Sequence, residues 1–144
     1  MDDYSDLKID NQLCFSLYAA SREVIKLYKP CLDKFNLTYT QYIVMLVIWE
    51  SEKNTVKGIG EKLHLDSGTL TPLLKKLEGM GLVIRYRDMN DDRVVIIEVT
   101  EKGRELKSQM KCIPKEMTSK INLTKNEIES LKYGLDQLLY KLKE

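Results

Sequence analysis

The sequence predicts a mainly α-helical fold with one small β-hairpin, and three features carry this prediction. Apolar residues recur at spacings of three and four along most of the 144 residues, which is typical of amphipathic helices. Residues 82–87 and 93–99 are two runs rich in β-branched residues around a polar turn, which is typical of a hairpin. Two short helical segments joined by a tight turn come directly before this hairpin. The order of elements predicts a winged helix-turn-helix.

Two helices are predicted in the first third of the chain. Residues 9–34 form the first, and Pro30 is expected to kink or shorten its end. Thr38 and Gln41 have the form of a capping box, which begins a second helix running to about Ser51. Because this second helix is apolar on most sides, we expect it at the centre of the core. The first helix has one apolar stripe, formed by Leu13, Leu17, Ala20, Val24 and Leu27.

Two short helices with helix-turn-helix spacing follow. Thr55 is expected to cap the first, which runs through Leu63 and places the single histidine, His64, on its surface. Asp66 or Ser67 caps the second, and Gly79 and Gly81 stop it. Its buried face is expected to consist of Leu70, Leu73, Leu74 and Leu77.

Two further helices are predicted after the hairpin. Thr100 caps one that runs to about Lys111 and is interrupted near Pro114. Thr124 and Glu127 form a second capping box, which begins the last helix. That helix carries a heptad seam of Ile128, Leu131, Leu135, Leu138 and Leu142. Such a narrow seam packs either against a second copy of the chain or within its own chain.

The second helix of a helix-turn-helix lies in the major groove of DNA, where its N-terminal residues meet the base edges. Hydroxyl groups bond bases or phosphates, and lysines suit phosphates. The alternative is an ordinary helix with a solvated polar face. The candidate DNA contacts, all off the leucine face, are Ser67, Thr69, Thr71, Lys75 and Lys76.

The hairpin favours DNA binding over that alternative. Arg85 and Arg87 alternate along its first strand, so both point to one face. Arg93 lies just past the tip beside Asp91, which can hold it in an extended pose by ion pairing. An arginine on such a wing can enter the minor groove, where negative potential is concentrated. The alternative is a hairpin edge protected by charges.

The terminal helices are expected to form a homodimer. A single copy cannot span two half-sites, whereas a two-fold dimer places two reading heads one helical turn apart on double-stranded operator DNA. We therefore expect one domain over residues 1–144. Its DNA-binding lobe covers about 38–99, and its dimerisation helices cover about 5–34 and 100–144.

The composition of the chain limits the location, metals and cofactors that are expected. The longest apolar run, residues 42–49, is too short to span a membrane, and the acidic N-terminus has no signal-peptide pattern, so a cytoplasmic location is expected. No metal and no cofactor are expected, because there is one histidine and no Cys-x-x-Cys spacing. The three cysteines, Cys14, Cys31 and Cys112, are expected as thiols in a reducing cytosol.

Three stretches resemble the MarR family of regulators. They are residues 66–78 (DSGTLTPLLKKLE), the Asp91-Asp92-Arg93 wing and residues 99–103 (VTEKG), and the resemblance extends over nearly the whole chain. Residues 11–18 (NQLCFSLY) resemble the organic hydroperoxide resistance branch (OhrR) and its staphylococcal relatives of the MgrA and SarZ type. Val94 departs from the small residue that is common after the wing arginine, which is expected to alter strand packing only.

The resemblance implies roles for particular residues. Cys14 becomes the peroxide sensor, and Tyr18, Tyr28 and Tyr39 hydrogen-bond its sulfur across the dimer interface. Cys112 is a possible resolving cysteine, and a small cytosolic thiol is the alternative. The implied DNA contacts are Ser67, Thr69, Thr71, Lys75 and Arg93.

Helix geometry supports part of this assignment. Cys14 and Tyr18 are four residues apart and hence neighbours, and Tyr28 falls within about 40° of the same face, so the three can line one surface. The positive end of the helix dipole favours a thiolate at Cys14, which is the form that peroxides oxidise. The alternative is a buried structural cysteine.

The expected function is a redox-sensing repressor, not an enzyme, that leaves its operator when an organic hydroperoxide oxidises Cys14. Two alternatives keep the fold: release by a small phenolic ligand, and a global redox regulator of the MgrA or SarZ type. A thiol peroxidase would need a base or an arginine beside the sulfur, and Arg22 is too far round the helix.

Overall fold

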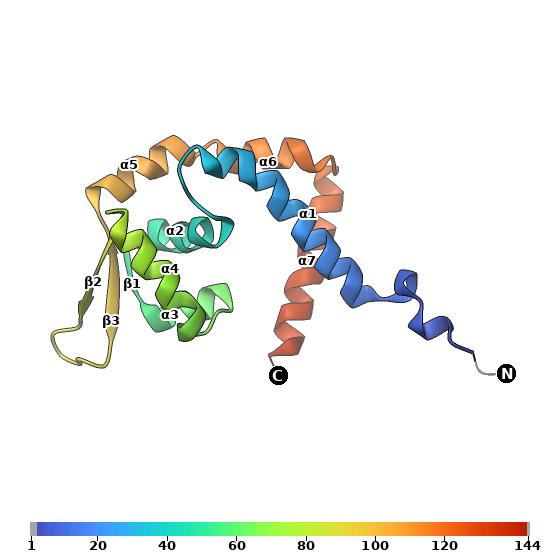
Figure 1. Cartoon of the computed structure of the whole chain (residues 1–144), viewed down its shortest axis with the longest axis horizontal. Helices are drawn as coiled ribbons and strands as arrows, with labels where there is room; N and C mark the ends of the chain where they lie inside the picture. The colour runs from blue at the N-terminus through green and yellow to red at the C-terminus, as the bar shows by residue number, and fades with distance from the viewer. Residues whose placement is uncertain (1–2, 144) are drawn as a thin grey trace. The chain divides into compact units, whose positions relative to one another are not determined.

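The computed structural model describes residues 3–143, and its elements confirm a mainly helical fold with a small sheet (Figure 1). The predicted domain (1–144) and the predicted dimerisation segment (100–144) include residues 1, 2 or 144, which lie outside the described residues. The chain divides into two compact units, and the boundary between them in the sequence falls between residues 112 and 113. The helices are α1 (Leu13–Asp33), α2 (Tyr39–Ser51), α3 (Val56–Leu63), α4 (Ser67–Gly79), α5 (Glu101–Met110), α6 (Ile113–Ile121) and α7 (Lys125–Leu142). The strands are β1 (Lys53–Thr55), β2 (Val83–Arg87) and β3 (Val95–Val99).

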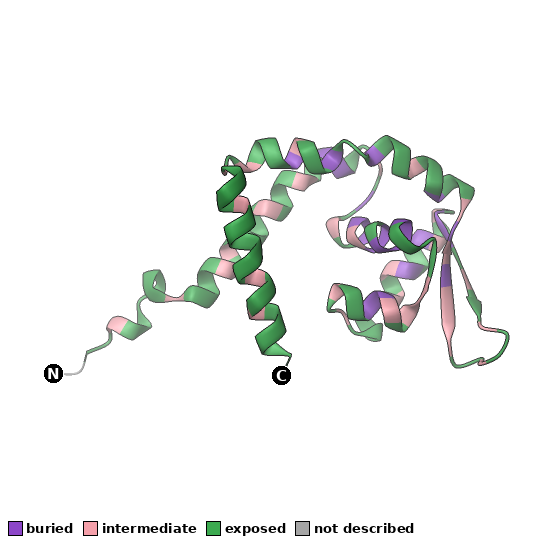
Figure 2. Ribbon diagram, turned by 180° about the vertical axis from the view of Figure 1, so that it is seen from behind, coloured by how far each residue is buried: buried purple, intermediate pink, exposed green. Residues whose placement is uncertain are grey.

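Helix α2 lies at the centre of the core of the first unit, as the sequence predicts. Val44, Met45 and Ile48 have no exposed surface, and burial in Figure 2 is densest in and around this helix. The predicted capping box is present: the hydroxyl of Thr38 accepts from the backbone N–H of Gln41, and the Gln41 side chain accepts from the N–H of Thr38. The cap therefore fixes where the central helix begins.

The sheet contains a strand that the sequence analysis missed. Strands β2 and β3 form the predicted hairpin, and β1 pairs with the other edge of β3, which gives the order β1-β3-β2. Lys53 lies opposite Glu98, and Thr55 lies opposite Ile96. The three polar residues of β1 have no strand pattern of their own and are extended because they pair with a distant segment.

The helix-turn-helix follows the prediction with one correction. Thr55 caps α3 and Asp66 caps α4, each by accepting a backbone N–H. His64 is exposed, as predicted, but it ends α3 in the left-handed conformation, with φ of 58°, and makes the turn. Gly60 leaves room for that turn, because a Cβ there would lie 2.6 Å from the carbonyl oxygen of Leu65. Three of the four predicted leucines on α4 are buried, and Leu73 is half-buried.

Helix α1 differs from the predicted range at its start. Two 3₁₀ turns, Ser5–Leu7 and Ile9–Asn11, precede it, so the helix begins at Leu13 rather than at residue 9. The helix continues three residues beyond Pro30 and ends at Asp33, one residue before the predicted end. Proline removes one backbone donor, and a single missing bond near a helix end leaves the last turn intact.

The second unit contains α6 and α7. The capping box of Thr124 and Glu127 begins α7 as predicted. None of the described residues of α7 is buried, and Leu131 and Leu142 of the seam are exposed. The seam residues thus remain available to a partner. Within residues 3–143, no helix is both long and apolar enough to cross a membrane.

Candidate DNA interface and thiol site

The N-terminal turn of α4 presents the predicted polar side chains. Ser67, Thr69, Lys75 and Lys76 are exposed, and Thr71 is half-buried. The backbone N–H of Thr69 donates to Asp66 at 2.7 Å, which lowers the pKa of that carboxyl and keeps the cap charged near neutral pH. The Thr71 hydroxyl donates to the Ser67 carbonyl at 2.7 Å, so only its oxygen lone pairs remain to accept from DNA.

The wing holds one arginine outward in a fixed pose. Both carboxylate oxygens of Asp91 accept from Arg93, from Nε at 3.0 Å and from Nη2 at 3.1 Å, which confirms the predicted ion pair. These bonds lower the pKa of Asp91 and raise that of Arg93, so both groups stay ionised. The side chain of Arg93 is still 86% exposed. Arg87 donates to the carbonyl of Asp92 at 2.6 Å and braces the same loop.

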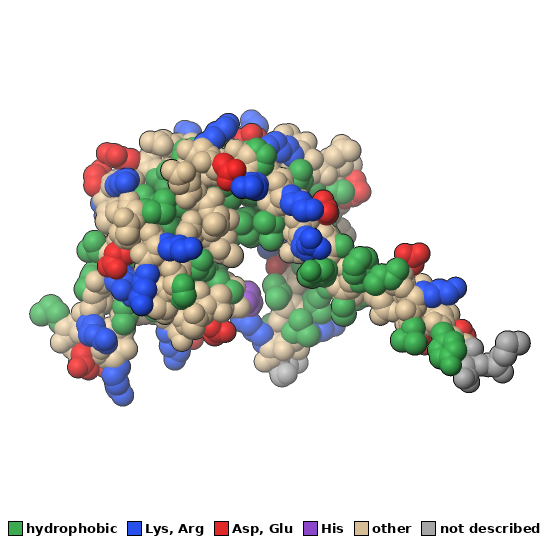
Figure 3. Space-filling view, viewed as in Figure 1, with side chains coloured by type: hydrophobic (Ala, Val, Ile, Leu, Met, Phe, Trp, Pro, Cys, Tyr) green, Lys and Arg blue, Asp and Glu red, His purple; other side chains and the backbone are tan. Residues whose placement is uncertain are grey.

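Arg85 has a different environment from the other wing arginines. Its Nε lies 3.1 Å from a carboxylate oxygen of Glu78 on α4, and its side chain is largely covered. No spacing in the sequence predicts this pair, because Glu78 and Arg85 belong to different elements. Arg85 therefore fastens the first strand of the wing to the recognition helix. Lys and Arg side chains, with acidic ones beside them, project from the hairpin end of this lobe (Figure 3).

Cys14 is the second residue of α1 and is exposed. The alternative of a buried structural cysteine is therefore wrong for the single chain. Gln12, which precedes the helix, makes no side-chain cap; its amide donates instead to the carbonyls of Asp6 and Lys8. The backbone N–H groups of the first turn are thus left without a side-chain cap beside the sulfur. The neighbouring Leu13 and Phe15 are exposed apolar side chains.

The predicted tyrosines divide into two groups. Tyr18 is exposed one turn from Cys14, and the Arg22 guanidinium lies 5.4 Å from its ring centroid. Tyr28 instead packs on Tyr39, with ring centroids 4.9 Å apart. Fourteen residues at 1.5 Å per residue place Tyr28 about 21 Å along the helix from Cys14. Tyr28 therefore cannot contact Cys14 within a single copy, and its predicted bond to that sulfur stays a prediction for the dimer.

A third ring completes this aromatic cluster. Tyr42 lies 5.8 Å from Tyr28 and 6.3 Å from Tyr39, centroid to centroid. The sequence analysis missed Tyr42 because it stands in the apolar run of α2. Burial raises the pKa of all three phenols, and that of Tyr42 reaches about 12. At physiological pH they are therefore hydrogen-bond donors.

We expect the free energy of unfolding to fall between pH 10 and 12. The unfolded chain releases the Tyr42 proton near pH 10, whereas the folded chain retains it to about pH 12, so deprotonation favours unfolding in this window. The loss is on the order of 1–2 kcal/mol. Urea unfolding at pH 8 to 11 measures it, and Tyr42→Phe is expected to reduce the slope. Tyr133→Phe, at an exposed phenol, is the control; an equal effect there would contradict the assignment.

The other two cysteines have different environments, and Cys31 lies close enough to Tyr28 to contribute to the raised pKa of that phenol. Cys31 is buried in the last turns of α1. Cys112 is exposed and lies between α5 and α6. None of the three forms a disulfide. No cluster of three His, Cys, Asp or Glu side chains suited to a metal occurs among residues 3–143.

A helix-turn-helix whose second helix exposes hydroxyls and lysines, followed by a hairpin with an outward arginine, defines a winged-helix DNA-binding protein. The family model for the transcriptional regulator SarA/Rot matches residues 26–110. The organic hydroperoxide resistance transcriptional regulator of Bacillus subtilis is 50% identical over 141 residues, which cover 98% of this chain and 93% of that protein. The chain belongs to the SarA/Rot family of transcriptional regulators, and its resemblance to the hydroperoxide resistance regulators is confirmed.

Another relative and three solved structures are similar to this chain over most of its length. SarZ of Staphylococcus epidermidis is 41% identical over 133 residues, 92% of this chain and 90% of that protein. Reduced AbfR bound to DNA has a TM-score of 0.78 at 38% identity, covering 96% of this chain and 97% of that one; disulfide-formed AbfR has a TM-score of 0.61. A MarR variant of Escherichia coli with operator DNA has a TM-score of 0.82 at 25% identity, covering 96% and 99%. The MarR-like fold is thereby confirmed.

Proposed function

We propose that this regulator is a homodimeric, cytoplasmic repressor that leaves a pseudo-palindromic operator when an organic hydroperoxide oxidises Cys14. The proposal includes no enzymatic turnover, since the peroxide is consumed once per thiol. The fold and the DNA-bound state of reduced AbfR, a 38% identical relative, support the DNA-binding part. The match to a hydroperoxide resistance regulator supports the choice of signal.

The observation that carries the sensor assignment is the position of Cys14. Its thiol is exposed at the uncapped start of α1, among exposed apolar side chains that suit an organic peroxide. Tyr28 is about 21 Å away in the same copy, so its phenol meets this sulfur only from a second copy. A sensor built from Cys14, Tyr28 and Tyr39 therefore requires the homodimer.

The chemistry needs one thiolate and one peroxide. The thiolate sulfur attacks one peroxide oxygen, an S–O bond forms as the O–O bond breaks, and the alkoxide leaves and takes up a proton to become an alcohol. Sulfur loses two electrons and the peroxide gains them. A second thiol, from a small cytosolic thiol or from Cys112, then forms an S–S bond while the S–O bond breaks and water leaves. The added bulk and the lost phenol–sulfur bonds are expected to move the two reading heads out of register.

The test is a DNA-binding titration with cumene hydroperoxide, with mass spectrometry of the same samples. Wild type is expected to release its operator as Cys14 gains one oxygen or a disulfide. Cys14→Ser is expected to remain bound, and Cys112→Ser serves as the matched control and separates the two disulfide routes. If Cys14→Ser is released as readily as wild type, the sensor assignment fails.

We expect Arg93→Ala to weaken operator binding about tenfold and to reduce the salt dependence by about two counterions per dimer, one at each half-site. The exposed guanidinium is held outward by Asp91, so its loss removes one contact from each half-site. Asp91→Asn keeps the cation but loses its orientation, and a two- to threefold effect is expected. Fluorescence anisotropy at several salt concentrations measures both. Lys26→Ala, which breaks an exposed pair on α1, is the control; an equal loss there would contradict the role of the wing.

A global redox regulator of the SarZ type is the second candidate, and the identity of 41% to SarZ over most of the chain favours it. It uses the same thiol chemistry but occupies many promoters. Genome-wide promoter occupancy separates the two: a single-target repressor gives one dominant site, and a global regulator gives many that are lost together on oxidation.

A further inference from the structure

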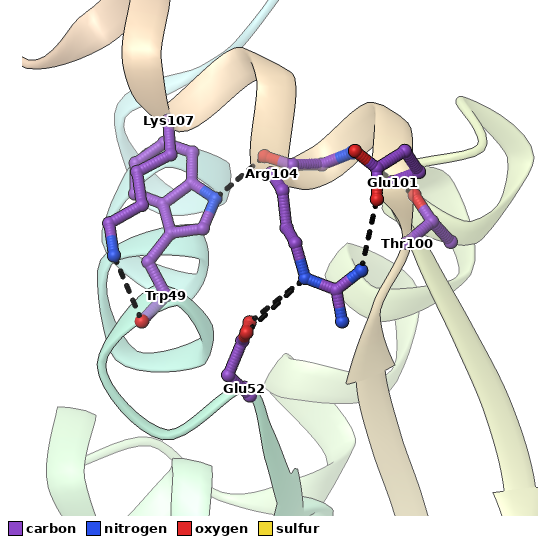
Figure 4. A network of polar contacts seen from close by, with 7 residues as sticks. Trp49, Glu52, Thr100, Glu101, Arg104 and Lys107 are labelled. Carbon is purple, nitrogen blue, oxygen red and sulfur yellow. Dashed lines mark hydrogen bonds and ion pairs between the residues drawn. The ribbon is translucent and has the colours of Figure 1, made fainter.

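The first turn of α5 is bonded to the C-terminal end of α2 (Figure 4). The indole N–H of Trp49, a buried side chain, donates to the carbonyl of Gly103 at 2.9 Å. Arg104 lies between two carboxylates, 3.2 Å from Glu52 and 3.3 Å from Glu101. Lys107 donates to the carbonyl of Trp49 at 3.4 Å. Three of these contacts, made by Gly103, Arg104 and Lys107, thus fix the first two turns of α5 to one end of the central helix, and the pair with Glu101 lies within α5.

The same turn is bonded to the chain that leaves the recognition helix. The Thr100 hydroxyl donates to the Gly81 carbonyl at 2.6 Å, and its backbone N–H donates to the Leu82 carbonyl at 3.1 Å. Lys102 donates to the carbonyl of Met80 at 2.8 Å, which places a cation at the C-terminus of α4, where the helix dipole favours it. Residues 100–107, here called the α5 clamp, therefore hold the ends of α2 and α4 together.

We propose that the α5 clamp sets the angle at which α4 meets DNA, and that Arg104 is its positioning residue. The inference rests on the proposed function. The clamp holds the C-terminus of α4, and buried Leu70 and Leu74 pack the helix on the rest of the lobe, so a tilt of the lobe at the clamp carries α4 with it over 13 residues, about 20 Å. A tilt of about 10° at the clamp moves the far end by about 3 Å, the length of a hydrogen bond. A movement of α5 thereby changes the distance between the two recognition helices of a dimer. The half-site spacing that the dimer prefers changes with it.

Removing the ion pair of Arg104 with Glu52 distinguishes an effect on the position of α4 from an effect on the stability of the fold. Both side chains are about half exposed, so the pair contributes little to the free energy of unfolding. A purely structural role predicts that its removal changes nothing measurable in DNA recognition. A positioning role predicts a change in spacing preference without a comparable change in thermal stability.

The first experiment measures binding to duplexes whose half-sites stand at the preferred spacing or one base pair nearer or farther. The duplex is obtained by selection with wild type from a randomised pool. Wild type is expected to prefer its spacing by at least about tenfold, and Arg104→Ala and Glu52→Gln to reduce this preference to about threefold or less. Arg104→Lys keeps the charge and is expected to retain most of the preference. Lys29→Ala, which breaks an exposed pair within α1, is the control. Unchanged spacing preference in Arg104→Ala overturns the proposal.

The second experiment needs no DNA. Trp49 is the only tryptophan, so its indole N–H gives one resolved proton signal. Arg104→Ala is expected to accelerate the solvent exchange of this proton, and of the backbone amides of residues 79–82, at least threefold, while Lys29→Ala leaves both unchanged. If the indole proton and these amides exchange as slowly in Arg104→Ala as in wild type, the proposed role of the α5 clamp is overturned. If wild type binds no duplex, the proposed function fails, and this exchange measurement still decides the clamp.

Discussion

Leu131→Glu is expected to convert the protein into monomers and to weaken operator binding by about 100-fold or more. Leu131 belongs to the α7 seam and is 54% exposed in the single chain, so a glutamate there costs little in folding. In a two-fold dimer the substitution occurs twice at one interface, and burying unpaired carboxylates costs several kcal/mol. Each 1.4 kcal/mol is a factor of ten in affinity, so loss of the second half-site gives an effect of this size.

Sedimentation and fluorescence anisotropy on the same preparation measure this effect. Ser130→Glu is the matched control, because it adds the same charge to an adjacent exposed position off the seam. It is expected to stay dimeric and to bind within about twofold of wild type. A Leu131→Glu protein that remains dimeric would show that the seam packs within its own chain, which is the alternative left open by the heptad pattern.

Gly103→Ala is expected to lower the free energy of unfolding by about 3 kcal/mol. A Cβ at this buried position would overlap the carbonyl oxygen of Leu82 and lie 2.7 Å from a methyl of Val99. Neither neighbour can withdraw, because the Leu82 carbonyl is backbone and accepts from Thr100, and Val99 is buried at the end of β3. The start of α5 must then move away from the sheet.

Thermal unfolding followed by circular dichroism measures the change, with a midpoint lowered by roughly 10 °C. Gly79→Ala is the control, because a Cβ there meets nothing within 4 Å. That substitution is expected to be neutral or to stabilise by up to about 1 kcal/mol, since alanine is the better helix former. Equal destabilisation by both substitutions would contradict the packing argument.

Local signals in the sequence predicted most of the fold. The caps at Thr38, Thr55 and Thr124 are formed by groups three residues apart, so spacing alone identifies them. The hairpin and the leucine face of α4 follow from periodicity in the same way. Strand β1 could not be predicted, because it is extended only through pairing with a segment more than 40 residues away.

The candidate site was predictable in part for a similar reason. The pairing of Asp91 with Arg93 follows from their separation of two residues. The pairing of Glu78 with Arg85, the packing of Tyr28 on Tyr39 and the α5 clamp depend on how separate elements pack, which no spacing in the sequence states. The distance of Tyr28 from Cys14 along the helix, by contrast, follows from their separation of fourteen residues.

The unexpected strand β1 has a consequence for how the wing behaves on DNA. An isolated two-stranded hairpin is marginally stable in water. Here β3 is the middle strand, and its backbone pairs with β1 on one side and β2 on the other. The base of the hairpin is thus stiff. Arg93, which Asp91 holds outward, therefore stands on strands that keep their register when the wing meets a groove.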